Sequence, residues 1–207
     1  ANFRLQVDAA TKGVRNVVVY LDGIRQGKPL PRDRQFTIDQ KSCEYVPHVL
    51  IAPRKSKIFF ASSDPILHNV HVFRGSPDEP HARTEDVFNR AMKDSRVSPV
   101  EMAKRDLRKA GFFFVRCDAG HIWMSAYIWV VGHPYHVLTD EQGRFELTDV
   151  PPGTYTLRFW HEGWEIQPVV RDGTVQEYTY GAPKQHTTTV EVKGGEAAEV
   201  AWAIPGG

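Results

Sequence analysis

Short apolar runs, each bounded by turn-forming residues, recur along most of the chain. The runs with strand character cover residues 16–21, 49–52, 57–61, 68–73, 112–115, 126–131, 145–147, 154–160, 187–192 and 199–203. Turn signals such as Asp22-Gly23, Pro53 and Pro151-Pro152-Gly153 separate them. Many short strands with regular turns indicate an all-β protein built from sandwiches or barrels.

One stretch departs from this pattern. Residues 75–98 are polar and rich in Pro, Asp, Glu and Arg, and we expect a loop there with a short helix over residues 85–92. Residues 100–109 have mixed charge and could form a helix or an exposed strand, and we favour a loop followed by an edge strand that leads into Gly111. Long loops in compact domains are often functional or mobile, and a solvated surface decoration is the alternative.

Composition and charge exclude several classes of function. The 207 residues carry a net charge of +1 with acids and bases interleaved, so we expect no nucleic-acid partner. No apolar run approaches the 18 residues of a membrane-spanning helix. The chain starts at Ala1 without a charged and apolar leader, which fits either an exported protein whose signal peptide has been removed or a trimmed chain. We therefore expect a periplasmic or extracellular location.

The residues with the most distinctive chemistry follow the apolar run at residues 111–115. Cys117, His121 and Met124 lie within eight residues, and His68 and His71 lie upstream. Two His, one Cys and one weak Met form the ligand set of a blue-copper site. His68 and His71 face opposite sides of a strand, and we select His68. A disulfide between Cys117 and the only other cysteine, Cys43, is the alternative, and it would remove the thiolate from this set.

Several segments resemble a plastocyanin-type cupredoxin across residues 34–132. They are Cys43-Glu44-Tyr45-Val46-Pro47, Ile51-Ala52-Pro53, residues 57–60, Asp64-Pro65, His68-Asn69-Val70 and residues 111–124. The resemblance implies a Greek-key β-sandwich that binds copper through His68, Cys117, His121 and Met124. Asn69 is then expected to brace the ligand loop. Phe112, Phe114 and Trp123 are expected to exclude water from the metal.

The ligand spacing departs from the usual pattern of that family. The string C-x3-H-x2-M resembles the second half of the binuclear copper loop of cytochrome oxidase, but Phe113 stands where that loop has its other Cys. A mononuclear site is therefore expected, while its spectral type and the binding of Met124 stay open. Cys43 is expected near the copper end, either as a small buried thiol or close enough to approach the metal.

A second resemblance covers the C-terminal part of the chain. Residues 139–147 and 150–157, with His161-Glu162-Gly163-Trp164, resemble a carboxypeptidase regulatory-like, transthyretin-like β-sandwich. The opening strands of that domain are missing after residue 132, and residues 3–23 look like them. We therefore expect one small domain from residues 1–33 and 133–207, with the copper domain inserted. The alternative is that the N-terminal strands pair with the copper domain.

The leading hypothesis for function is an extracytoplasmic electron carrier that exchanges single electrons with redox partner proteins. Four protein ligands leave no open metal position, and no acid–base pair or nucleophile is evident, so we do not expect an enzyme. A copper-tolerance or copper-delivery protein, a red-copper-like site with an open position, and a pure interaction module are the alternatives. Zinc also accepts Cys and His ligands.

Overall fold

The computed structural model describes residues 5–32 and 34–204, and these residues form an all-β protein. The expected fold class is therefore confirmed. Residues 1–4, 33 and 205–207 of the two expected domains lie outside the described residues. The described residues form strands and no helix, so none of them makes a helix that could cross a membrane.

The strands are β1 (Val18–Asp22), β2 (Gln35–Lys41), β3 (Glu44–Val46), β4 (Val49–Pro53), β5 (Lys57–Ser62), β6 (His68–Gly75), β7 (Glu85–Met92), β8 (Val100–Glu101), β9 (Gly111–Arg116), β10 (Ser125–Val131), β11 (His136–Leu138), β12 (Gly153–His161), β13 (Gln167–Arg171), β14 (Thr174–Thr179) and β15 (Lys184–Val192). They divide between two compact units. The discontinuous unit comprises residues 1–30, 133–164 and 182–207, and the sandwich unit comprises residues 31–132 and 165–181. The expected domain boundaries at residues 33 and 132 stay a prediction.

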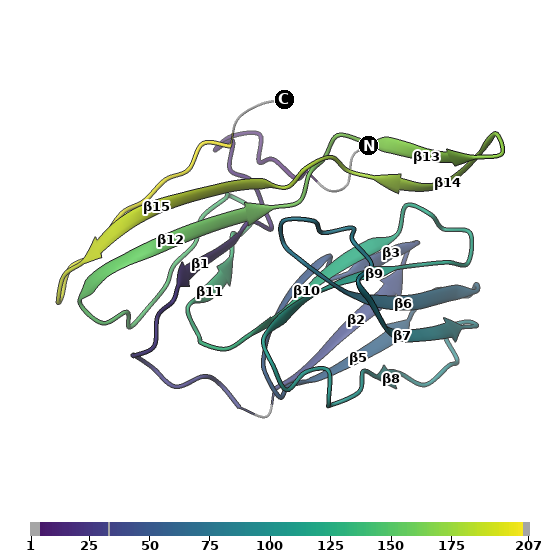
Figure 1. The fold of residues 1–207 in the computed structure, drawn as a ribbon, viewed down its shortest axis with the longest axis horizontal. Coiled ribbons are helices and arrows are strands. Elements are labelled where there is room, and N and C mark those ends of the chain that lie inside the picture. The colour runs from purple at the N-terminus through teal and green to yellow at the C-terminus, as the bar shows by residue number, and fades with distance from the viewer. Residues whose placement is uncertain (1–4, 33, 205–207) are drawn as a thin grey trace. The chain divides into compact units, whose positions relative to one another are not determined.

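The sandwich unit contains two large sheets, in the orders β4-β10-β9-β6-β7 and β3-β2-β5-β8, and the two-stranded sheet β13-β14 (Figure 1). The pairs β4–β10 and β2–β5 are parallel, and the other pairs are antiparallel. One hydrophobic cluster draws on strands of both sheets, and its fully buried members include Ile38, Ile58, Phe60, Val70, Val72, Phe113, Val115 and Ile128. Side chains alternate across a strand, so every second residue of β5, β6 and β9 enters this core.

The polar stretch after β6 contains a strand where we expected a helix. Residues 85–92 form β7, which pairs antiparallel with β6 so that Met92 lies opposite His68. Met92 is fully buried, and Val87 and Phe88 pack against the core. The helix prediction was wrong because pairing with β6, together with the packing of these few apolar side chains against the core, holds the segment extended. Of residues 100–109, only Val100–Glu101 form a strand, β8, which pairs with β5.

The discontinuous unit has one sheet in the order β11-β1-β12-β15. Strand β1 is hydrogen-bonded to β11 on one side and to β12 on the other, so the N-terminal strand pairs within this unit. Residues 145–147 and 199–203 form no strand, which contradicts two of our predictions. Their apolar side chains pack against the core instead, among them Phe145, Leu147, Val200 and Trp202. Apolar alternation in these segments reflects packing without pairing to a neighbouring strand.

Candidate metal centre

His68 opens β6 and is completely buried. Its Nε2 lies 2.8 Å from Asp64 Oδ2, while its Nδ1 has no hydrogen-bond partner in the described part of the chain. With the ring proton on Nε2 donated to the carboxylate, the lone pair of Nδ1 is free. A buried polar atom without a partner costs about 1–3 kcal/mol, a cost that a bound metal ion would remove. A histidine ligand that donates its other N–H to a carboxylate is the usual arrangement at metal sites.

Cys117 follows β9 and is also buried. It lies an even number of residues after Phe113 and Val115, so it faces the same core. Its Sγ accepts a hydrogen bond of 3.3 Å from the backbone amide of Asn69, the residue after His68. The side-chain Oδ1 of Asn69 accepts from the backbone amide of Asp118 at 3.3 Å, which confirms that Asn69 braces the ligand loop.

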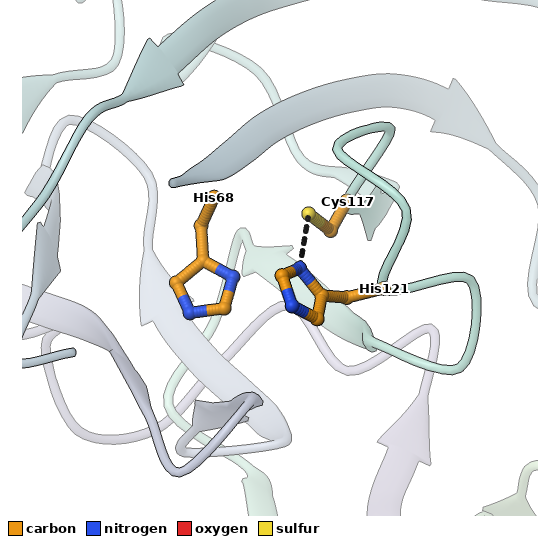
Figure 2. Close-up of side chains that lie close together, drawn as sticks. All are labelled: His68, Cys117 and His121. Carbon is orange, nitrogen blue, oxygen red and sulfur yellow. Dashed lines mark hydrogen bonds between the residues drawn. The ribbon is translucent and has the colours of Figure 1, made fainter. Parts of the chain in front are cut away.

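His121 completes the cluster from the loop after Cys117. Its Nδ1 lies 3.9 Å from Cys117 Sγ, and its ring centroid lies 4.5 Å from that of His68. Figure 2 shows one ring nitrogen of each histidine directed toward the space beside the sulfur. One ligand atom from each of the three residues fits within 4.8 Å of the others. Burial, and secondarily the charge of His68, lower the pKa of His121, so its imidazole is neutral and able to bind a metal at neutral pH.

Met124 closes the ligand loop through its backbone. Its amide donates to the His121 carbonyl at 2.9 Å, and its carbonyl accepts from the Cys117 amide at 3.4 Å. The side chain is buried in the same core cluster as Cys117. Trp123, expected to exclude water, is 44% exposed and lies edge-on to the His121 ring at 5.4 Å. The ligand loop therefore has one buried side, at Met124, and one exposed side, at Trp123.

The Tyr45 hydroxyl links the two strands that carry the buried candidate ligands. It lies 2.5 Å from the carbonyl oxygen of Asn69, after His68, and 2.9 Å from that of Arg116, before Cys117. Its single proton is shared between these acceptors. Burial, and then the electrostatic effect of Cys117, raise the pKa of Tyr45 well above its usual range, so the hydroxyl keeps its proton.

His71 lies outside the cluster, as its spacing from His68 predicts. Its Nδ1 is 2.5 Å from Asp118 Oδ2, and its Nε2 is 2.8 Å from Asp86 Oδ2. Arg116 Nε also contacts Asp118, at 2.7 Å, and the guanidinium group pairs with Glu177 of β14. These ion pairs hold the start of the ligand loop from outside the core.

The structure also brings together Cys43, Asp64 and His68, a set of possible metal ligands that the sequence did not predict. Cys43 is a free, partly exposed thiol, and Cys117 is also free. One ligand atom each from Cys43, Asp64 and His68 lie within 4.8 Å of one another. The sequence signal was the placement of Cys43 near the copper end. Asp64 was interpreted only as a turn residue.

Fold and site together define an all-β protein with a cysteine–histidine–histidine cluster in which His68 and Cys117 are buried and His121 is partly exposed. No protein-family model and no curated protein sequence matches the chain. Among solved structures, the copper-containing nitrite reductase from Thermus scotoductus SA-01 aligns with a TM-score of 0.38 and 17% identity, over 54% of this chain and 25% of its own. This chain thus spans about a quarter of the length of that reductase.

Two smaller proteins also align with part of the chain. Auracyanin A, a blue copper protein from Chloroflexus aurantiacus, gives a TM-score of 0.37 and 13% identity, over 47% of this chain and 98% of its own. A pseudoazurin from Sinorhizobium meliloti gives a TM-score of 0.33 and 20% identity, over 49% of this chain and 76% of its own. Each likeness extends over about half of this chain.

Proposed function

We propose that the chain is an extracytoplasmic copper protein that carries single electrons through a mononuclear site of His68, Cys117, His121 and Met124. The observation that carries the proposal is the buried, unpartnered Nδ1 of His68 beside a free thiol and a second imidazole. One soft thiolate and two imidazoles suit copper, and a thioether supplies the weak fourth ligand. The donor atoms of these four residues therefore fit copper.

Copper supplies one-electron chemistry by cycling between Cu(I) and Cu(II), and the protein keeps the donor atoms in place through that cycle. Asp64 fixes the ring of His68 by accepting from Nε2. The amide of Asn69 donates to Cys117 Sγ and stabilises negative charge on the sulfur. Two loops held by one sandwich need little rearrangement when the charge of the site changes.

Electron exchange with partner proteins is proposed to use the His121 edge. His121 is partly exposed and its neighbour Trp123 is 44% exposed, whereas His68 and Cys117 are buried. We do not propose an enzyme, since four protein donors leave no position for a substrate on the metal. The proposed partners are donor and acceptor redox proteins.

The discontinuous unit is proposed to be a carboxypeptidase regulatory-like, transthyretin-like module without catalytic residues. In support of this, the Pro151-Pro152-Gly153 turn leads directly into β12, which lies between β1 and β15. A fold of this kind does not itself assign an activity.

The proposal is tested by visible absorption and EPR spectra of the Cu(II)-loaded protein, of Cys117→Ser and of Cys43→Ser as the matched control. We expect a strong thiolate-to-copper band in the wild type and in Cys43→Ser, and its loss in Cys117→Ser. A wild-type protein that binds Cu(II) without such a band would refute the electron-carrier proposal. Retention of the band in Cys117→Ser would assign the thiolate ligand to Cys43.

A further inference from the structure

The imidazole of His68 has donor atoms on two sides. Its Nδ1 belongs to the cluster with Cys117 and His121, whereas Asp64 approaches its Nε2 at 2.8 Å. The thiol of Cys43 joins Asp64 and His68 within the 4.8 Å limit. The oxygen that contacts Nε2, Asp64 Oδ2, also accepts from the Cys43 amide, and we therefore assign this second group to the Nε2 side. Sulfur, carboxylate oxygen and imidazole nitrogen are the three donor types found at protein zinc sites.

The chain folds locally in a way that presents these donors together. Ser42 and Cys43 form the turn between β2 and β3 and both have positive φ angles of 56°. Asp64 holds this turn, because Oδ1 accepts from the Ser42 amide at 2.7 Å and Oδ2 accepts from the Cys43 amide at 2.9 Å. Cys43 is partly exposed and the Asp64 side chain is 13% exposed, so an ion can reach the group from solvent.

The charges of the group favour a cation. Burial acts to raise the pKa of Asp64, but hydrogen bonds from the Cys43 and Ser42 amides and from His68 outweigh it, so the carboxylate is ionised at neutral pH. Burial, then the charges of Asp64 and Cys117, raise the pKa of the Cys43 thiol. A divalent cation between these donors would offset that repulsion and stabilise the thiolate.

We propose that Cys43, Asp64 and His68 form a second metal site, for a thiophilic divalent cation of the zinc class. On binding, the thiol of Cys43 loses its proton to solvent. When copper is absent, the His68 proton moves from Nε2 to Nδ1 and Nε2 binds the cation, so one proton is released per ion. The site does not require Cys117.

The test uses Co²⁺, a spectroscopic substitute for zinc, in the Cys117→Ser background, where Cys43 is the only thiol. We expect a thiolate-to-cobalt charge-transfer band that is lost in the Cys43→Ser/Cys117→Ser double variant. Adding Asp64→Asn to Cys117→Ser should weaken Co²⁺ binding at least tenfold. The matched control adds Asp39→Asn to Cys117→Ser. The Asp39 carboxylate accepts a hydrogen bond from the Ser63 hydroxyl and is not a donor of the proposed site, so the Co²⁺ affinity should be unchanged.

A second measurement does not depend on the spectrum. Alkylation of Cys43 by iodoacetamide, followed by mass spectrometry in the same background, should slow at least tenfold when Zn²⁺ is added. Urea unfolding of each variant verifies that it is folded. Absence of the cobalt band, absence of protection by Zn²⁺, or an effect of Asp64→Asn below tenfold would each overturn the second site. None of these outcomes bears on the copper proposal, because every arm lacks Cys117.

Discussion

Replacing Tyr45 by Phe tests how the fold holds the candidate ligands. The hydroxyl is buried between the carbonyls of Asn69 and Arg116, which adjoin His68 and Cys117. Asn69 O keeps a second donor, the side-chain amide of Gln40 at 3.0 Å, whereas the Arg116 carbonyl loses the hydroxyl. The variant loses the hydrogen bond that the Tyr45 hydroxyl shares between the two carbonyls, and the Arg116 carbonyl loses one donor. We therefore predict a loss of about 1–2 kcal/mol in the free energy of unfolding.

The assay is urea unfolding of the metal-free protein, followed by near-ultraviolet circular dichroism and analysed by linear extrapolation. For a chain of this length, the loss corresponds to a fall in Tm of roughly 2–8 °C. The matched control is Tyr155→Phe in the discontinuous unit, which removes one hydroxyl donated to Pro151 O at 2.8 Å. In the copper-loaded protein, Tyr45→Phe should also change the thiolate band, and Tyr155→Phe should not. A Tyr45→Phe variant with the wild-type urea midpoint would refute the assigned role of the hydroxyl.

Three further predictions concern single positions. Asp64→Asn should weaken copper binding about 10- to 100-fold in a chelator competition titration, because His68 loses its charged acceptor; unchanged affinity would contradict this. Burial, then the charge of His133, lower the pKa of His136 to about 3, so from about pH 6.5 down to 3 the unfolded chain binds more protons. The free energy of unfolding should fall with pH by up to about 1.4 kcal/mol per unit there, and urea midpoints of His136→Gln should depend less on pH; equal dependence would exclude this origin. Gly27→Ala should cost at least about 2 kcal/mol in thermal unfolding, since its φ is +123° and the new Cβ would lie 1.8 Å from the Tyr135 hydroxyl; a loss below about 0.5 kcal/mol would contradict the predicted clash.

Strands with one buried face were predictable from the sequence, because apolar and polar residues alternate along them. The sequence placed strands at residues 57–61, 68–73 and 112–115, close to the observed β5, β6 and β9. The edge strand β7 was not predictable in this way, since its pairing with β6 and not its own pattern makes residues 85–92 extended. The opposite error occurred at residues 145–147 and 199–203, where apolar side chains pack without a strand partner.

The candidate site was predictable where its residues are close in sequence or belong to a recognisable pattern. The structure brings His68, Cys117 and His121 together, while the role of the Met124 sulfur stays a prediction. The prediction that Phe112 and Phe114 of β9 exclude water from the metal was wrong. Phe113 and Val115 enter the core on the side of Cys117, and Phe112 and Phe114 face away and contact Tyr127. The group with Cys43 and Asp64 depends on a turn folding back over 21 residues, which no local pattern records.

The path of the chain between the two units has a mechanical consequence. Strands β1 and β15 belong to the discontinuous unit, and the sandwich unit takes its residues from two segments enclosed between them. A pulling force applied through residues outside β1 and β15 therefore acts first on the sheet that contains β1, β12 and β15. The sandwich with its candidate ligands bears the load only after that sheet opens. In a single-molecule pulling experiment, the discontinuous unit should protect the candidate metal ligands from tension.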